Sequence, residues 1–116
     1  MSLFRHQVAF SKDLVKLLNF INDLGYDFSI GEAFRTPEQQ RIYLRQGKSK
    51  TMNSMHLKKC AIDLYILGYD NKIIYDSKDP DIIIISNYWK SLSPLNRWGG
   101  DWKSLNDSVH FDRYVK

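Results

Sequence analysis

The sequence predicts an α+β fold, a small antiparallel sheet with helices packed on one side. Apolar side chains recur at helical spacing over residues 10–24, whereas residues 26–30 and 60–67 alternate apolar and polar side chains as strands do. At 116 residues, 43% of them hydrophobic and 26% charged, the chain has the size and composition of one globular domain. We therefore expect a single domain, residues 1–116, with one core.

The first two predicted helices have recognisable ends. The helix over residues 10–24 has one apolar stripe and stops at Gly25, a residue that tolerates the backbone conformation found after helices. The second helix begins after Thr36, whose hydroxyl can cap it, and Pro37 fits its first turn. It ends at Gly47.

Residues 82–92 form the third predicted helix. The preceding Asp79-Pro80 pair is typical of a helix start, and the apolar segment is long for a strand. Four consecutive isoleucines, residues 82–85, suit a strand equally well, because β-branched side chains favour extended backbone. The helical interpretation therefore rests on length and on the Asp-Pro start.

Four strands are expected, two of them joined in a hairpin. The turn Gly-Tyr-Asp-Asn, residues 68–71, separates the strand over residues 60–67 from a return strand over residues 72–75. The other two strands are residues 26–30 and 109–115. Between these elements, residues 47–55 form a polar loop and residues 97–102 a tight aromatic turn.

Composition excludes several classes of protein. Cys60 is the single cysteine and cannot form an internal disulfide; we expect a small apolar core role for it rather than a nucleophilic one. The aliphatic run of residues 82–85 is far shorter than the roughly 20 apolar residues that cross a bilayer. A net charge of +4 favours encounter with polyanions, but no nucleic-acid-binding signature is present. We expect a monomer that binds no nucleic acid and does not insert into membranes.

Three residues carry the chemistry that the sequence predicts: His56, Asp63 and His110. Imidazole nitrogen and carboxylate oxygen are ligands that zinc favours, and a catalytic zinc site keeps three protein ligands and an open position for water. Asp107 lies three residues before His110, so its carboxylate can stand beside that water as a general base. Arg35 follows a strand-like stretch, from which its guanidinium can reach the site and stabilise an oxyanion.

Each of these residues also has a structural interpretation. A single histidine is more often structural than metal-bound, Asp63 can cap the hairpin, Asp107 can be a turn residue, and Arg35 can be solvated. The apolar neighbours of Asp63 favour burial, however, and a buried carboxylate needs a partner such as a cation. The third histidine, His6, lies in an unpatterned segment and is not expected to be a ligand.

Aromatic and basic residues flank the predicted site. Trp98 and Trp102 surround Gly99-Gly100 and are either core residues or one wall of a substrate groove. The basic stretch is either a solvated loop or a surface that attracts an acidic substrate. Its members are Lys48, Lys50, Lys58 and Lys59.

In their order along the chain, these motifs resemble the zinc D-alanyl-D-alanine carboxypeptidases and dipeptidases and the phage L-alanyl-D-glutamate endolysins, which share a fold with the hedgehog signalling domain. The family pattern Ser-x-His-x-x-Gly-x-Ala-x-Asp is matched by Ser54, His56, Ala61 and Asp63. A later acidic residue before a His-Phe pair is matched by Asp107, His110 and Phe111. Residues 32–40 are similar to the arginine-bearing segment of the family, and residues 99–102 to its Gly-Gly-x-Trp turn.

The resemblance implies a zinc peptidase with a hedgehog-like fold and one zinc ion per chain. The implied zinc ligands are His56, Asp63 and His110. The implied catalytic residues are Asp107 as general base and Arg35 as electrophilic stabiliser of the attacked carbonyl. The candidate substrate-binding residues are Ser54 and Trp102.

Lys59 departs from the family pattern, which commonly has glycine at this position. If the position needs a left-handed backbone, a lysine there costs about 1 kcal/mol or more, and the loop can run differently.

The function that we expect is hydrolysis of a stem-peptide bond of peptidoglycan by a phage or prophage endolysin-type L-alanyl-D-glutamate endopeptidase. The first alternative is a D-alanyl-D-alanine carboxypeptidase or dipeptidase, and the second a non-catalytic wall-binding module of the same fold. Residues 1–7 lack the charged start and apolar run of a secretory signal, so we expect synthesis in the cytoplasm and action on the cell wall after release.

Overall fold

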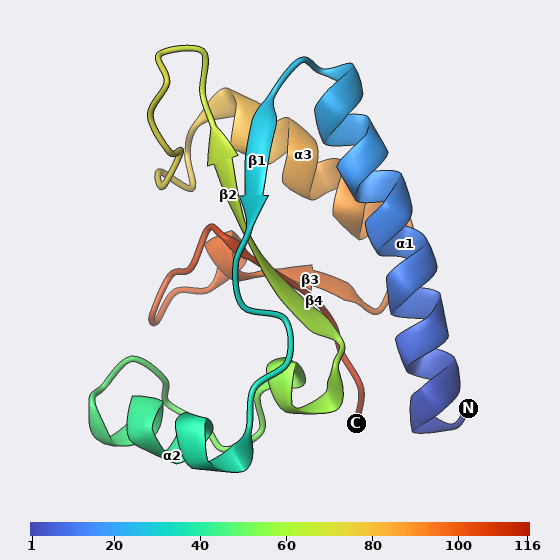
Figure 1. Ribbon diagram of the computed structural model, residues 1–116, viewed down its shortest axis with the longest axis vertical. Helices are drawn as coiled ribbons and strands as arrows, with labels where there is room; N and C mark the ends of the chain where they lie inside the picture. The colour runs from blue at the N-terminus through green and yellow to red at the C-terminus, as the bar shows by residue number, and fades with distance from the viewer.

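The structure is a computed structural model that describes all 116 residues (Figure 1). In chain order its elements are α1 (Leu3–Asp23), β1 (Asp27–Ile30), α2 (Pro37–Arg45), the 3₁₀ turn η1 (Met55–Lys58), β2 (Ala61–Leu67), α3 (Pro80–Ser91), β3 (Asn96–Trp98), the 3₁₀ turn η2 (Gly99–Asp101) and β4 (His110–Arg113). The predicted α+β fold is confirmed. None of the helices combines the length and the apolar character needed to cross a membrane.

The strands form one antiparallel sheet in the order β1-β2-β4-β3. β2 is shared, because its second half pairs with β1 and its first half with β4. Across β2 and β4, Asp63 lies opposite His110 and Ala61 opposite Asp112; across β4 and β3, Asp112 lies opposite Arg97. Since side chains of a strand alternate between the two faces, this register decides which of them meet.

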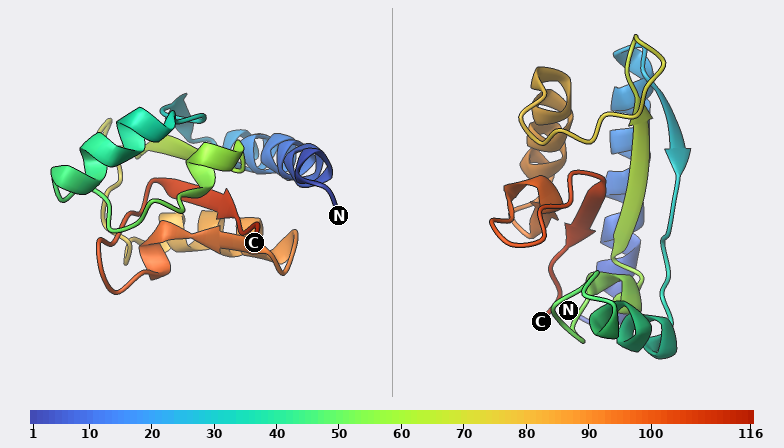
Figure 2. Two further views of the ribbon diagram at one scale, coloured as in Figure 1. Left: turned by 90° about the horizontal axis from the view of Figure 1, so that it is seen from below. Right: turned by 90° about the vertical axis from the view of Figure 1, so that its left-hand side faces the viewer.

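One face of the sheet packs against α1 and α3, which also contact each other. β2 buries Ile62, Leu64 and Ile66 in this core, whereas the alternating residues Asp63 and Tyr65 are only half-buried on the opposite face. α2 lies apart from the other helices, at one end of the sheet (Figures 1 and 2). The face opposite the core is therefore free to carry polar side chains beside α2.

Trp89 of α3 fastens the core to the strands that carry His110 and Asp112. Its side chain is fully buried and meets the rings of Phe10 and Phe111 edge-on, with centroids 5.6 and 6.3 Å away. The indole N–H donates to the carbonyl oxygens of Arg97 and Asp112 at 3.0 and 3.2 Å. A single side chain of α3 thus holds β3 and β4 in place.

The predictions for α2 and α3 are confirmed. The Thr36 hydroxyl accepts a hydrogen bond from the backbone N–H of Gln39 and caps α2, and the Asp79 carboxylate caps α3 in the same way. α3 is a helix rather than a strand. Ile82 and Ile85 are buried while the two isoleucines between them are exposed, a pattern that a helix produces and the alternation of a strand does not. The helical period thereby places only one side of the apolar run in the core.

Four other predictions differ from the structure in whole or in part. α1 begins at Leu3, capped by Ser2, rather than at residue 10, because its first two turns are exposed or only half-buried and leave no apolar stripe to detect. The return strand of the hairpin is wrong: after the turn, only Ile73 forms a bridge, to Leu67. β4 pairs with the first half of β2, and after the bridge at Ile73 the chain continues to α3 without forming a further strand.

The tight aromatic turn over residues 97–102 is wrong in part, because residues 96–98 form β3 and the turn proper is η2. The polar loop before His56 is also shorter than expected, since η1 begins at Met55. β3, η2 and η1 are very short, so none of them contains a repeat of apolar residues from which its structure could be predicted.

Lys59 has a left-handed backbone, with φ +57° and ψ +34°, and ends η1. The position does require the conformation for which glycine is favoured. In compensation, the Lys59 ammonium lies 5.5 Å from the centroid of the Phe34 ring, a cation–π contact.

We predict that Lys59→Gly is more stable than Lys59→Ala by about 1 kcal/mol, because both variants lose the contact with Phe34 and only glycine removes the strain of the left-handed backbone. Chemical denaturation of the two variants measures the difference in the free energy of unfolding. Equal stability of the glycine and alanine variants would show that this backbone position is not strained.

Candidate metal centre

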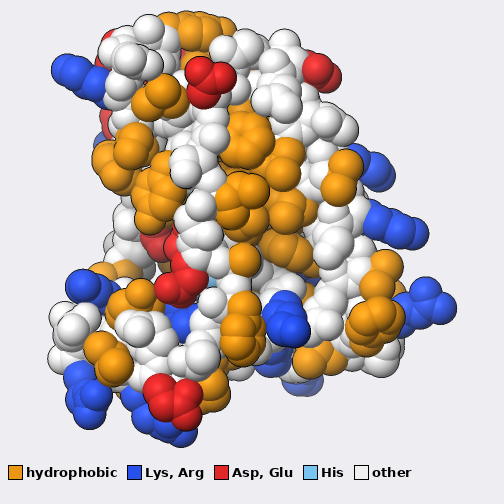
Figure 3. Space-filling model, viewed as in Figure 1, with side chains coloured by type: hydrophobic (Ala, Val, Ile, Leu, Met, Phe, Trp, Pro, Cys, Tyr) orange, Lys and Arg blue, Asp and Glu red, His pale blue; other side chains and the backbone are white.

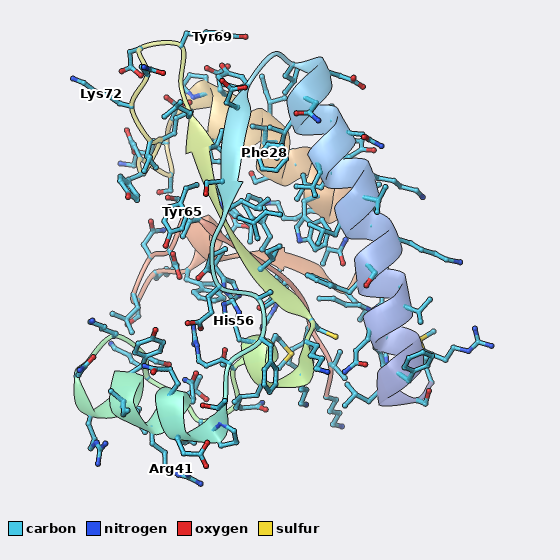
Figure 4. The ribbon with its side chains drawn as sticks, viewed as in Figure 1. Phe28, Arg41, His56, Tyr65, Tyr69 and Lys72 are labelled. Carbon is cyan, nitrogen blue, oxygen red and sulfur yellow. The ribbon has the colours of Figure 1, made fainter.

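Three separate elements bring His56, Asp63 and His110 together. His56 lies in η1, Asp63 in the middle of β2, and His110 at the start of β4. The β2–β4 register places Asp63 directly opposite His110. In Figure 4, His56 points into the space between the strands and α2. The structure therefore brings together the three residues that the sequence singles out as metal ligands.

The distances among the three side chains suit a metal ion. The Asp63 Oδ1 atom lies 3.3 Å from His56 Nε2 and 3.5 Å from His110 Nδ1, and one ligand atom from each residue lies within 4.8 Å of the others. Four ligands about 2.0 to 2.1 Å from a tetrahedral ion are about 3.3 Å from one another. Two of the three separations match this value closely.

The imidazole rings are held so that each presents one nitrogen to the cluster. His56 Nδ1 lies 2.8 Å from the carbonyl oxygen of Ala33, which can only accept, so the proton resides on Nδ1 and Nε2 keeps its lone pair. His110 Nε2 lies 2.7 Å from Asp112 Oδ2, which likewise can only accept, so Nε2 carries a proton and Nδ1 is the nitrogen that faces the cluster. Such partners behind the rings are typical of metal-binding histidines.

Two buried atoms of the cluster, His56 Nε2 and Asp63 Oδ1, have no hydrogen-bond partner in the protein. Buried polar atoms without partners are rare and costly, and a cation between them would satisfy both. The donor set, two imidazoles and one carboxylate, also fits a divalent ion such as zinc. The residues present therefore fit a metal ion, although their assignment as ligands stays a prediction.

The charges within the cluster shift two pKa values. Burial alone would raise the pKa of Asp63, but the imidazoles of His110 and His56, 3.5 and 3.3 Å from its Oδ1 atom, outweigh burial and lower the pKa to about 2. Burial likewise lowers the pKa of His110, but the carboxylates of Asp112 and Asp63 outweigh it and raise this pKa to about 9. A metal ion that binds here must therefore displace a proton from His110.

Asp112 and Arg97 extend the site behind His110. Asp112 is almost fully buried and accepts two hydrogen bonds of 2.9 Å from the Arg97 guanidinium, in addition to its contact with His110. Neither residue is among those that the sequence predicts for the site. A signal for Asp112 was present, because it lies two residues after His110 and so shares the same face of β4.

Asp107 lies beside the cluster, on the segment between η2 and β4. Burial and the nearby charge of Asp63 raise the pKa of its carboxyl group. Its backbone is held by Gly99, whose carbonyl oxygen accepts from the Asp107 N–H at 3.0 Å. A side chain at Gly99 would collide with the Asp107 carbonyl and come within 3.0 Å of His110 Cβ. This close approach explains a glycine at position 99 and brings a second carboxylate to the site.

Arg35 reaches the site from the segment before α2. Its guanidinium forms an ion pair with Glu32, donates to Gln40 Oε1 at 2.8 Å, and stacks on the Tyr43 ring at 4.7 Å from the centroid. Gln40 is completely buried and binds the loop that follows α2 through Ser49 and the carbonyl of Thr51. The sequence does not predict these supporting contacts.

The cluster opens into a cavity of about 580 Å³, which the side chains of Arg35, Ser54, Trp102 and Asp107 also line. Ser54 caps η1 by accepting from the backbone N–H of His56 at 3.3 Å, and the Trp102 ring lies 4.8 Å from that of His110, between centroids. Both residues therefore position a histidine. Their contact with a substrate stays a prediction.

Three other residues from the sequence analysis lie away from the cavity. Trp98 is buried and its indole N–H donates to the carbonyl of Ser108, so it is a core residue. Cys60 is buried in the core, where burial raises the pKa of its thiol, which confirms its apolar role. His6 accepts a hydrogen bond from Arg113, outside the cluster.

The family profile described as D-alanyl-D-alanine carboxypeptidase, of the M15 peptidases, matches residues 47–113, more than half of the chain and all three candidate ligands. The chain belongs to this family. Members of the family are generally metal-dependent, in agreement with the His-Asp-His cluster.

Two individual relatives of the chain are L-alanyl-D-glutamate peptidases. The chain is 31% identical over 97 residues to the L-alanyl-D-glutamate peptidase of Listeria phage A118, covering 82% of the chain and 33% of that protein. It is 28% identical over 102 residues to the peptidoglycan L-alanyl-D-glutamate endopeptidase CwlK of Bacillus subtilis, covering 76% of the chain and 61% of CwlK. The chain thus spans about a third and three fifths of these relatives.

A solved structure of a related enzyme has the same fold. The crystal structure of the Serratia marcescens L-Ala D-Glu endopeptidase ChiX superposes with a TM-score of 0.67 at 26% identity, covering 89% of the chain and 79% of ChiX. The likeness therefore includes nearly every element described above.

We predict that Asp112→Asn lowers the affinity for a divalent metal ion by about 10- to 100-fold, because the ring of His110 loses the carboxylate that orients it. Competition with a chromophoric chelator measures the affinity. Arg97→Lys, which keeps the charge but not the two-pronged contact, should cause a smaller loss.

The control for this measurement is Asp101→Asn, which removes an exposed carboxylate paired with Lys90 outside the cavity. Its metal affinity should equal that of the unsubstituted protein. Asp112→Asn binding the metal as tightly as this control would contradict a role for Asp112 in holding His110.

Proposed function

We propose that the chain is a zinc-dependent peptidoglycan peptidase that hydrolyses the L-alanyl-D-glutamate bond of the stem peptide, acting on the cell wall. The observation that carries the proposal is the cluster of His56, Asp63 and His110 at the wall of a cavity that also contains the carboxylate of Asp107. The names of the phage peptidase, CwlK and ChiX supply the scissile bond.

Zinc, when bound, supplies Lewis-acid chemistry: it makes a water molecule more acidic and polarises a carbonyl group. The residues of the chain do the rest. Asp107 takes the proton of the attacking water, and its raised pKa suits it to accept that proton and return it to the leaving amine. Arg35, locked by Glu32 and Gln40, presents a fixed positive charge to the carbonyl oxygen as negative charge develops there.

The ion pair between Arg35 and Glu32 does not remove Arg35 from this role. One of its nitrogens, Nη1, reaches Gln40 and lies 3.5 Å from Ser54 Oγ, and the residue lines the cavity. A guanidinium carries five N–H donors, so several remain for a substrate. Glu32 and Gln40 reduce the entropy that Arg35 would otherwise lose when a substrate binds.

A second candidate is a D-alanyl-D-alanine carboxypeptidase, which the description of the matched family favours. The same residues would serve, because both reactions hydrolyse a peptide bond. A non-catalytic wall-binding module is less well supported. The raised pKa of Asp107 and the partnerless atoms of the cluster destabilise the fold and have no use in such a module.

The test is hydrolysis of defined muropeptides, with the new chain ends identified by mass spectrometry. We expect new L-alanine carboxyl ends and D-glutamate amino ends, no activity after treatment with a chelator, and recovery when zinc is added. Release of only terminal D-alanine would replace the proposal by the second candidate, and no hydrolysis by the zinc-loaded protein would reject both.

We predict that Asp107→Asn lowers kcat by about 10²- to 10⁴-fold, the usual contribution of a general base. The zinc content should stay at one ion per chain, because Asp107 is not one of the three ligands. Elemental analysis and muropeptide hydrolysis measure the two quantities on the same preparation. Asp101→Asn is the matched control, and equal rates for both variants would remove Asp107 from the mechanism.

A further inference from the structure

The cavity contains four basic side chains, and only two of them are neutralised. Arg35 is paired with Glu32 and Arg97 with Asp112. Lys48 and Lys50 also line the cavity, and neither forms an ion pair. Two positive charges at the cavity wall therefore have no anionic partner in the protein.

The structure separates these two lysines from the other two of the basic stretch. Lys58 donates to the carbonyl oxygen of Val115 at 2.8 Å, and Lys59 lies over the Phe34 ring. Neither of them lines the cavity. On the face shown in Figure 3, basic side chains surround α2 and acidic ones lie between α2 and the strands. Of the four lysines, therefore, only Lys48 and Lys50 are placed to attract an acidic group into the cavity.

Lys50 is the better placed of the pair. Lys48 already rests 5.8 Å from the centroid of the Tyr43 ring, a partial cation–π partner. Lys50 donates to the hydroxyl of Ser104, which also lines the cavity and belongs to the segment between Trp102 and Asp107. Its ammonium keeps two further N–H donors, and the Ser104 hydroxyl keeps its own proton to donate.

We propose that Lys50 and Ser104 together bind a carboxylate of the substrate, on the amino acid whose amine leaves when the peptide bond breaks. This inference rests on the proposed function. An ammonium and a hydroxyl that are already in contact can donate to the two oxygens of one carboxylate. Lys50 then fixes the register of the peptide against Asp107, because Ser104 and Asp107 belong to the same short segment.

The carboxylate has two sources, one for each candidate function. A glutamyl residue keeps one carboxyl group outside the peptide chain whichever carboxyl the chain uses, and a terminal D-alanine ends in a carboxylate. In both cases the charge lies on the leaving side of the scissile bond. A site for it explains why the cavity holds unpaired lysine charge in addition to the arginine that faces the attacked carbonyl.

The experiment compares two peptides that differ in one group. Each contains the L-alanyl-D-glutamyl bond, with the glutamyl carboxyl that lies outside the chain either free or converted to the carboxamide. The zinc-loaded protein should hydrolyse the free acid with a higher kcat/KM. Lys50→Met should reduce that preference by about three- to tenfold, the range for an exposed charge-assisted contact.

Lys103→Met is the matched control, because it removes the same charge beside Ser104 from a residue that does not line the cavity. It should keep the preference of the unsubstituted protein, whereas Ser104→Ala should lose part of it. The inference is overturned if Lys50→Met retains the full preference, or if Lys103→Met loses it to the same extent.

A third peptide, ending in D-alanyl-D-alanine, identifies the source of the carboxylate. Hydrolysis of this peptide alone, with a rate that Lys50→Met lowers, would assign the site to a terminal carboxylate and reject the L-alanyl-D-glutamate proposal. Hydrolysis of the glutamyl peptides with equal kcat/KM for acid and amide would keep the proposed function and reject the role of Lys50.

Discussion

The pairing of β2 with β4 is the constraint on which the site depends. With Asp63 opposite His110 and Ala61 opposite Asp112, one carboxylate lies in front of the imidazole and another behind it on the same face of the sheet. A shift of one residue would turn His110 and Asp112 into the core and Phe111 out of it. The buried Phe111 and the contacts of Trp89 with both strands make that shift costly. The apolar core thereby determines the geometry of the polar face.

Two close approaches of the backbone complete the arrangement. Gly31 donates to the carbonyl of Asp63 at 2.8 Å, and a side chain there would come within 2.5 Å of the Tyr65 ring, so any other residue would displace that ring. Gly99 plays the corresponding part beside Asp107. Lys59, in contrast, takes a left-handed conformation without being glycine. Part of the stability of the fold is thus given up to keep η1 and His56 in position.

The sequence predicts the residues of the site better than the structure that supports them. His56, Asp63 and His110 are detectable because few residue types bind metals and their spacing is recognisable, and α2 and α3 because their caps have a chemical signature. Arg97 and Gln40 are different, since each acts through a contact whose partner is distant in the sequence or is brought near by a loop. β3 escaped detection because three residues are too few to show alternation. Hydrogen-bond partners that only the tertiary fold brings together cannot be predicted from local sequence patterns.

Without a metal ion, the polar face of the sheet destabilises the fold. The carboxylates of Asp63, Asp107 and Asp112 lie near two imidazoles in a largely buried place, and burial together with the negative charge of Asp63 raises the pKa of Asp107. A divalent cation bound here would relieve this repulsion and satisfy the partnerless atoms of His56 and Asp63. Metal binding would therefore be coupled to folding, since an ion that binds only the folded chain stabilises it. A chain of this size has only one core to offset the cost of gathering these carboxylates without a metal ion.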